Sequence, residues 1–521
     1  MPRPFDLIAG LRGWRRFLAA LAAGGLASLA LPPAYILPVF LIAFPVLLLL
    51  LGSCTRPRQA LLTGFAFGFG FYAIGLYWIG FALLVEAARF AWLLPVAVFG
   101  IAAILAAFSA VACLPAWAVR KLGGGWISTL LALAGGWTLL EWCRNWAFTG
   151  FPWNPVGSVW GFADIMVQPA SVIGVFGLSL LTLLLAGLPL LLVTTSGAVR
   201  GAIITLTLAG MAGWTGSGYY RLQQNPTVFV ENVGLRLVQA NIDQRDKWRR
   251  DLRVPNLTRL LALSADQRPD WVTHVIWPET AATFFLSENP DVVRAIASVA
   301  PAGGAVLTGA PRQAKRDGLP VYYNSLQAIS GSGEILASYD KAHLVPFGEY
   351  VPLRDWLPID RIVAGRGDFT AGPGPRTLRL PGLPSFSPLI CYEAIFPGVA
   401  VDASDRPDWI LNISNDAWFG VSAGPHQHLA SSRMRAIEEG LPLIRATNTG
   451  ITVAFDPFGR ELQRLDLDRR GTLDLRLPKP ASSPTIFSLF GNVVPVLLAG
   501  LIVLVAIGSV LQSRRRSASG D

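Results

Sequence analysis

The 521-residue chain is 52% hydrophobic and only 15% charged, and its mean hydropathy is +0.47. This composition excludes an ordinary soluble protein of that length. The net charge of +10 does not indicate nucleic-acid binding, because the basic residues cluster beside apolar segments and form no stripe with interleaved aromatic residues. Four cysteines in so long a chain exclude a disulfide framework.

Apolar segments lie before about residue 216 and after residue 485. A spanning helix needs about 20 mostly apolar residues, and about eight segments of that kind predict an α-helical transmembrane bundle. They comprise residues 17–34, 36–53, 60–84, 91–117, 126–146, 172–194, 199–216 and 487–511.

Basic residues are concentrated in alternate loops of this bundle and at both termini. The positive-inside rule then places both termini in the cytoplasm and the large polar segment on the opposite side. A cleaved signal peptide over residues 1–30 is the rival interpretation, with Arg15-Arg16 as its basic region and Ala27–Ala30 near the cleavage point. It would remove one span and break the even number that the loop charges require.

The predicted domains are therefore a seven-span bundle at 1–216, an extracytoplasmic domain at 217–485, and a last transmembrane helix with a basic tail at 486–521. Short β-rich runs alternate with helical stretches in the central segment, which predicts an α/β domain. In the membrane part, Phe148–Pro155 forms an aromatic loop that includes Trp153. Such a loop either anchors the protein at headgroup depth or lines an entry for a lipid.

Three polar groups of the central segment follow predicted strands. Glu279, Lys341 and Cys391 each come where an apolar run ends, and functional groups of α/β folds gather at such ends. A carboxylate can accept the proton of a thiol that attacks a carbonyl, and an ammonium can stabilise the resulting oxyanion. Taken singly, each residue is more simply a solvated or buried structural group, so the prediction depends on all three together.

The motifs around these residues carry a family resemblance. Trp277–Thr280, Tyr339–Pro352 and Ile390–Glu393, followed by Asn412–Asp416 and Arg445–Gly450, resemble the nitrilase superfamily in order and spacing. The resemblance implies a Glu–Lys–Cys triad on an inserted α-β-β-α sandwich domain. In this chain Glu279 would be the general base, Lys341 would hold the oxyanion, and Cys391 would be the nucleophile.

The architecture as a whole is similar to the apolipoprotein N-acyltransferase family. That resemblance implies transfer of an acyl chain from a phospholipid, through a Cys391 thioester, to the α-amino group of a diacylglyceryl-modified cysteine of apolipoproteins. It also implies a monomer in the bacterial inner membrane with its catalytic domain on the periplasmic side. Glu349, Tyr392 and Glu393 match functionally important positions of the family, and Trp418 is a candidate part of a mobile acyl-binding loop.

Other function classes fit less well. A membrane-tethered amidase would use the same triad but would need one anchor at most. A transporter would bury ionisable groups along a pathway, and Glu141 with Arg144 is the main intramembrane pair. A metal site is disfavoured because the close pair His426 and His428 has no accompanying ligand cluster. No phosphate-cradling glycine loop is present, so no cofactor is expected.

Overall fold

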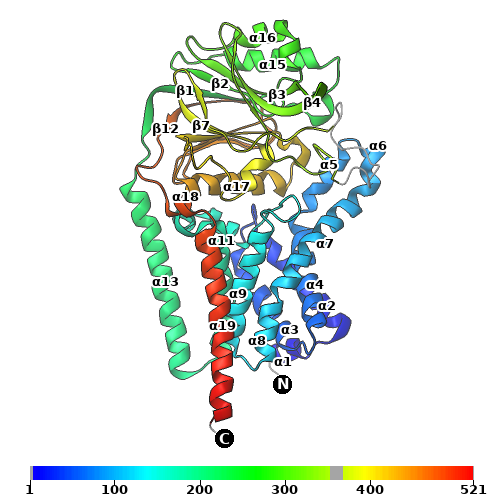
Figure 1. Cartoon of the computed structure of the whole chain (residues 1–521), viewed down its shortest axis with the longest axis vertical. Coiled ribbons are helices and arrows are strands. Elements are labelled where there is room, and N and C mark those ends of the chain that lie inside the picture. The colour runs from blue at the N-terminus through cyan, green and yellow to red at the C-terminus, as the bar shows by residue number, and fades with distance from the viewer. Residues whose placement is uncertain (1–3, 353–367, 520–521) are drawn as a thin grey trace. The chain divides into compact units, whose positions relative to one another are not determined.

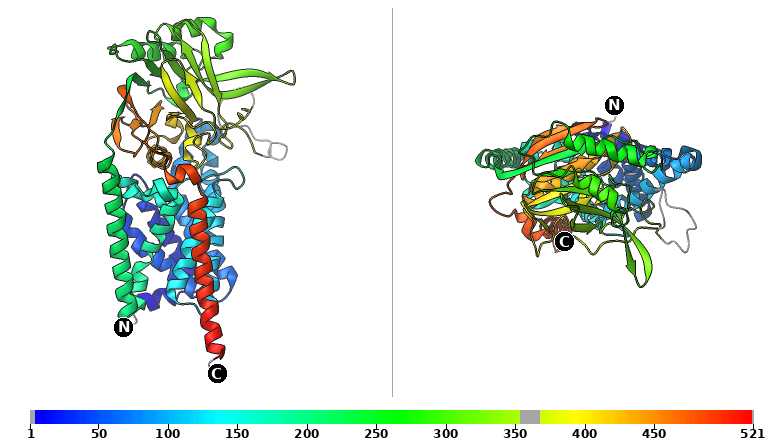
Figure 2. Two further views of the ribbon diagram at one scale, coloured as in Figure 1. Left: turned by 60° about the vertical axis from the view of Figure 1, so that its left-hand side comes forward. Right: turned by 90° about the horizontal axis from the view of Figure 1, so that it is seen from above.

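The computed structural model describes residues 4–352 and 368–519. The chain divides into two compact units. One contains Met1–Gly80, Trp92–Gln224 and Leu489–Asp521 and is helical; the other contains Phe81–Ala91 and Asn225–Ser488 and holds the β-sheets. Figure 1 shows the course of the chain through both units, and Figure 2 shows the same ribbon from two further directions.

The helical unit contains long apolar helices together with shorter helices of four to eight residues. Its α2 and α4 pack closely through glycines, because a Cβ atom on Gly24 would lie 1.8 Å from the carbonyl oxygen of Phe67, and one on Gly70 would lie 2.1 Å from that of Leu21. Small residues commonly permit such close approach of helices in membranes. The helices are α1 (Pro4–Ala9), α2 (Gly13–Ala27), α3 (Phe40–Gly52), α4 (Pro57–Gly75), α7 (Leu94–Ala112), α8 (Leu114–Lys121), α9 (Trp126–Cys143), α10 (Asp164–Val167), α11 (Ala170–Ala186), α12 (Leu188–Thr194), α13 (Gly197–Gln224) and α19 (Val493–Ser519), with α18 (Ile486–Phe490) before the last.

Within the described residues, three helical segments are long and apolar enough to cross a membrane: Ala87–Lys121, Ala170–Thr194 and Val493–Arg516. A fourth is obtained if Pro57–Gly75 and Tyr77–Leu84 count as one span, although they are bent by 56°. The protein is therefore a membrane protein. The predicted span 60–84 is not one straight helix, because Leu76 leaves the helical conformation after Gly75.

The other unit contains two six-stranded sheets. The first has the order β12-β1-β2-β3-β4-β5 and the second β11-β10-β9-β8-β7-β6. In each sheet the central strands are parallel and the outer pairings are antiparallel. The strands are β1 (Phe229–Gln239), β2 (His274–Ile276), β3 (Ala305–Arg316), β4 (Leu319–Ser330), β5 (Ile335–Asp340), β6 (Leu378–Leu380), β7 (Leu383–Ile390), β8 (Trp409–Ser414), β9 (Leu443–Thr447), β10 (Thr452–Phe455), β11 (Glu461–Leu465) and β12 (Gly471–Pro478).

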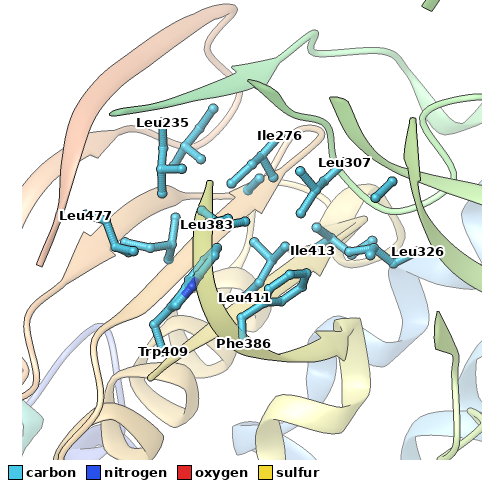
Figure 3. Close-up of a cluster of buried hydrophobic side chains, with 14 of the residues drawn as sticks. Leu235, Ile276, Leu307, Leu326, Leu383, Phe386, Trp409, Leu411, Ile413 and Leu477 are labelled. Carbon is cyan, nitrogen blue, oxygen red and sulfur yellow. The ribbon is translucent and has the colours of Figure 1, made fainter. Parts of the chain in front are cut away.

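Side chains from both sheets share one apolar core. Leu235, Ile276 and Leu307 of the first sheet face Phe386 and Leu411 of the second (Figure 3). Central strands covered on both faces need apolar residues on both, which explains the continuous apolar runs of the sequence. Helices cover the outer faces: α15 (Arg253–Ala265) and α16 (Pro290–Ala297) pack on the first sheet, and α17 (Ala423–Glu439) packs on the second.

A short segment from the predicted membrane part belongs to this sheet-containing unit. It is Phe81–Ala91, with α5 (Phe81–Leu84) and α6 (Ala87–Phe90). Phe81 lies against Gly420, where a Cβ atom would come within 2.5 Å of its ring. The sequence assigned residues 81–84 to a membrane span because of their apolar character. In the structure they instead cover the loop that follows β8.

Candidate active site

The three predicted catalytic residues stand at the carboxyl ends of three strands, two in the first sheet and one in the second. Glu279 follows β2, Lys341 follows β5 and Cys391 follows β7. All three are buried, with 6%, 1% and 7% of their surfaces exposed. Lys341 Nζ lies 3.6 Å from Glu279 Oε1, and the charges of Glu279 and Lys341 both act on the Cys391 thiol. The structure therefore brings the thiol, the carboxylate and the ammonium into one buried site.

Cys391 opens a short 3₁₀ helix, Cys391–Ile395, directly after β7. Its φ of +53° lies in the left-handed region, which is uncommon for a non-glycine residue and is maintained only by surrounding structure. Burial raises the pKa of the Cys391 thiol and Glu279 raises it further, whereas Lys341 lowers it. The resting thiol is therefore protonated at neutral pH, and a base must remove its proton before attack.

Glu279 is held as a base by neutral donors. Asn324 Nδ2 donates to its Oε1 at 2.7 Å, and the backbone N–H of Asn415 donates to its Oε2 at 2.9 Å. These bonds fix both carboxylate oxygens. Both donors are neutral, and Lys341 is the cation that pairs with this carboxylate, 3.6 Å away.

Lys341 lies between two carboxylates. Its Nζ is 3.0 Å from Glu349 Oε2 and donates to Glu349 Oε1 at 3.1 Å. Burial acts to lower the pKa of Lys341, but attraction to Glu349 and Glu279 outweighs it and the pKa is raised. Lys341 therefore keeps its charge at neutral pH and suits oxyanion stabilisation rather than proton transfer.

Glu349 and Glu393 both organise the site. Glu349 accepts hydrogen bonds from Asn324 Nδ2 at 2.8 Å and from the backbone of Val345 at 2.8 Å. Glu393 accepts from Tyr339 and from the backbone N–H groups of Ala342, His343 and Ile390, at 2.7–3.1 Å. Glu393 therefore joins the strand end that bears Cys391 to the loop that begins at Lys341.

The aromatic candidates differ in position. Tyr392 is buried beside His343 and Phe396, with ring centroids 5.7 and 5.1 Å away. Trp418 is half-buried in the turn Asp416–Phe419 after β8, and among the described interactions none joins it to Glu279, Lys341 or Cys391. Trp153 belongs to the helical unit, where its ring lies 4.7 Å from that of Trp78 and its carbonyl accepts a bond from Arg144.

Several buried polar residues at the site were not singled out from the sequence. Lys247, at the end of α14 (Gln244–Lys247), is 3% exposed and donates to the carbonyl oxygen of Glu279 at 3.0 Å. Burial lowers its pKa to about 8, while Glu279 and Cys391 act in the opposite direction. Asn324 bridges Glu279 and Glu349. The sequence does not indicate that either residue is buried, because Asn324 is a polar residue within a strand and Lys247 lies among charged neighbours.

Behind Cys391 lies a second buried cluster, formed by Asp416, His428 and Arg445. Burial and Arg445 lower the pKa of His428 despite Asp416, while Arg445 and His428 outweigh burial and lower the pKa of Asp416. One ligand atom each from Cys391, Asp416 and His428 lies within 4.8 Å of the others, which is close enough to hold a metal ion. However, both ring nitrogens of His428 already face hydrogen-bonding partners, and Asp416 is paired with Arg445 at 2.6 Å. A metal would have to displace these partners, so this cluster is better suited to orienting Cys391.

A buried thiol close to a carboxylate and an ammonium, on two packed sheets, is suited to thiol chemistry. Residues 235–481 match the carbon-nitrogen hydrolase family. Residues 23–188 match the N-terminal domain of apolipoprotein N-acyltransferase. The chain is 40% identical over 520 residues to the apolipoprotein N-acyltransferase of Rhodopseudomonas palustris, covering 95% of each chain, and 41% identical over 514 residues to that of Bradyrhizobium diazoefficiens, with the same coverage.

The chain therefore belongs to the apolipoprotein N-acyltransferase family, and it is an acyltransferase, as the sequence motifs predicted. Some solved structures resemble about half of this chain. An amidase from Nesterenkonia sp. AN1, carrying an acetamide adduct on its active-site cysteine, is 18% identical and matches 48% of this chain and 93% of its own, with a TM-score of 0.33. So distant a likeness gives no support to amide hydrolysis as the reaction.

Proposed function

We propose that this enzyme transfers an acyl chain from a phospholipid to the α-amino group of a diacylglyceryl-cysteine at the N-terminus of apolipoproteins. The observation that carries the proposal is the buried Glu279–Lys341–Cys391 cluster in a chain that is related over its whole length to apolipoprotein N-acyltransferases. The acceptor is inferred from the names of those relatives, and the mechanism is inferred from the chemistry of the cluster.

In the first half-reaction, Glu279 takes the thiol proton and Cys391 Sγ attacks the ester carbonyl of the phospholipid. The positive charge of Lys341 stabilises the tetrahedral oxyanion. The carbon–oxygen bond then breaks, Glu279 returns the proton to the departing glycerol oxygen, and a lysophospholipid leaves. Cys391 is left as an acyl thioester.

In the second half-reaction, the acceptor amine attacks the thioester carbonyl. Glu279 removes a proton from the amine, the carbon–sulfur bond breaks, and the proton passes to Cys391 Sγ. The product is an amide, and the free thiol is restored. Water must be excluded while the thioester waits for the amine, which is consistent with a site whose three central residues are at most 7% exposed.

The test is to incubate the purified full-length enzyme with a phospholipid that carries an isotopically labelled acyl chain, and to analyse Cys391 by mass spectrometry. The expected result is a mass increase of one acyl group on Cys391, which an acceptor lipopeptide removes as the labelled amide. Cys391→Ala should remain unlabelled. A thioester discharged by water alone would indicate a hydrolase, and full activity of Cys391→Ala would overturn the proposal.

We further propose that the chain crosses the bacterial inner membrane eight times. Its domain boundaries would be 1–216, 217–485 and 486–521, and its catalytic domain would be an α-β-β-α sandwich in the periplasm. The alternation of basic loops supports this topology. Trp153 and Trp418 would contact the lipid substrates, and one chain would act as a monomer. Alkaline phosphatase fused after Gln224 should be active, and the same reporter fused after Arg516 should be inactive.

A further inference from the structure

The helical unit contains a cavity that the acyl-transfer mechanism does not use. It has a volume of about 490 Å³ and lies between α11 and α13. That volume falls within the roughly 300–1,000 Å³ of typical small-molecule sites. Leucines of α11 and residues from the middle to the C-terminal part of α13 line most of it, among them Leu181, Leu184, Leu185, Leu206 and Met211.

One end of the cavity is polar and positively charged. Arg221, near the end of α13, donates to the side chain of Gln168, which precedes α11, and the hydroxyls of Ser171 and Ser217 line the same end. The start of α11 lies near Arg221 and its end shares the cavity with Leu206, so α13 runs antiparallel to α11. From Leu206 to Arg221 the cavity follows about 22 Å of helix at 1.5 Å per residue. The site is therefore a long apolar groove with a cation at one end.

Such a groove is suited to an amphiphile. Apolar walls hold water poorly, and an unfilled cavity forfeits packing energy. The segment Ala170–Thr194, which contains α11, is apolar enough to cross a membrane, so the available filler is a lipid acyl chain. A guanidinium near the membrane surface attracts an anionic phosphate. Arg221 also lies four residues before Asn225, where the sheet-containing unit begins.

We infer that the groove between α11 and α13 binds one phospholipid as a resident ligand, with an acyl chain along the leucines and the phosphate at Arg221. Contacts near the C-terminal end of α13 attach it to the bundle. Trp214 Nε1 donates to Met166 O at 2.8 Å, and a Cβ atom on Gly218 would lie 2.2 Å from Ile165 O. Towards the other end, Leu206 and Leu208 are 72% and 66% exposed. The cavity extends from these contacts to Leu206, so the lipid would cover an exposed part of α13.

Two glycines of the groove provide a sharp test. Gly210 and Gly213 line the cavity, and a Cβ atom on either meets nothing within 4 Å, so leucines there would enter the groove without a backbone clash. Gly201 and Gly216 on the same helix are equally open but do not line the cavity. The double variant Gly201→Leu/Gly216→Leu is thus a matched control for Gly210→Leu/Gly213→Leu.

The measurement is the number of phospholipids that remain on the full-length protein after detergent washing, determined by native mass spectrometry. Using Cys391→Ala as the background prevents acyl removal and separates this lipid from the acyl donor. We expect one phospholipid per chain in the background and control proteins, at least a tenfold lower bound fraction in the groove-filled variant, and a partial loss in Arg221→Gln. Equal retention in the filled and control variants would overturn the inference, since it would indicate only exchangeable surrounding lipid.

A second measurement covers the case in which the filled variant does not fold. A photoactivatable phosphatidylethanolamine, reconstituted with the Cys391→Ala protein, should label peptides containing residues 171–185 and 204–217. Labelling spread evenly over the outer surfaces of the helices would contradict a resident site. Thioester formation on wild-type Cys391 is measured separately, so failure of the lipid site would leave the proposed acyl transfer intact.

Discussion

The carbonyl oxygen of Cys391 lies 3.0 Å from Nε2 of His428, and both residues are buried. In the neutral ring, Nε2–H donates to this carbonyl and Nδ1 accepts from Arg445 at 3.0 Å. Asp416 is 3.0 Å from the same Nδ1 and pairs with Arg445. Because Cys391 has a positive φ, a fixed bond to its carbonyl helps to maintain the backbone turn that presents the thiol.

Replacing His428 should therefore disturb the nucleophile without removing any reacting group. In His428→Leu the Cys391 carbonyl loses its donor, and an unsatisfied buried acceptor costs about 1–3 kcal/mol. If this free energy adds to the activation barrier of acylation, thioester formation slows by about 5- to 150-fold. His428→Gln retains an N–H donor and should recover part of the rate. The measurement is single-turnover acylation of Cys391, and equal rates in the two variants would contradict a positioning role.

Glu393 should be sensitive even to the nearly isosteric change to glutamine. Its carboxylate accepts four hydrogen bonds, including three from backbone N–H groups, and Glu393→Gln places an N–H₂ group where only acceptors fit. We expect acylation of Cys391 to slow by about 100-fold or more, with lower thermal stability, since hydrogen bonds to a charged group are worth about 1.5–3 kcal/mol each. Glu461→Gln, at an exposed strand position, is the control and should behave as wild type.

Lys341 should be required for both stability and activity. Lys341→Met leaves Glu279 and Glu349 without their shared cation, and breaking a buried ion pair by removing one partner costs about 3–5 kcal/mol. Loss of oxyanion stabilisation should lower the acylation rate by about 100- to 1,000-fold. The comparison is with Lys315→Met, at an exposed end of β3. Activity within a few-fold of wild type would contradict the role assigned to Lys341.

The sequence predicted which strand ends bear Glu279, Lys341 and Cys391, because buried central strands read as apolar runs and stop where polar groups begin. The residues that support them are only partly predictable, because the family resemblance indicates Glu349 and Glu393 but not Lys247 or Asn324. Lys247 lies among charged residues and looks solvated in sequence, yet the sheets and loops around it leave it buried. His428 attracted notice as half of a histidine pair with His426. Its ring is instead hydrogen-bonded to the Cys391 carbonyl, and this contact depends on how α17 packs on the second sheet.

The ends and bends of the membrane helices are less predictable from the sequence than the strands of the sheets. A window of apolar residues does not show where a helix breaks, so residues 81–84 were assigned to a span although they pack beside Gly420. Leu76 gives no sequence sign of the bend that follows Gly75, because leucine is a good helix former. In the structure Asn154 Nδ2 donates to the carbonyl oxygen of Gly75 at 3.2 Å, a contact between distant residues that periodicity does not report.

Lys247 predicts a specific dependence of stability on pH. Burial lowers its pKa in the folded protein to about 8, against 10.5 in the unfolded chain. The unfolded chain therefore binds more protons between pH 8 and 10.5, so raising the pH through this window increases the contribution of Lys247 to the free energy of unfolding. Below about pH 8 the contribution is constant and unfavourable.

Lys247→Met removes this titration. Thermal unfolding of the full-length protein in detergent, measured from pH 7 to pH 10, should show wild type gaining stability relative to Lys247→Met only above about pH 8. Lys315→Met, at an exposed position, should run parallel to wild type over the same range. A constant difference between wild type and Lys247→Met would mean that Lys247 titrates in the folded protein as it does in the unfolded chain, and that its burial beside Glu279 does not shift its pKa.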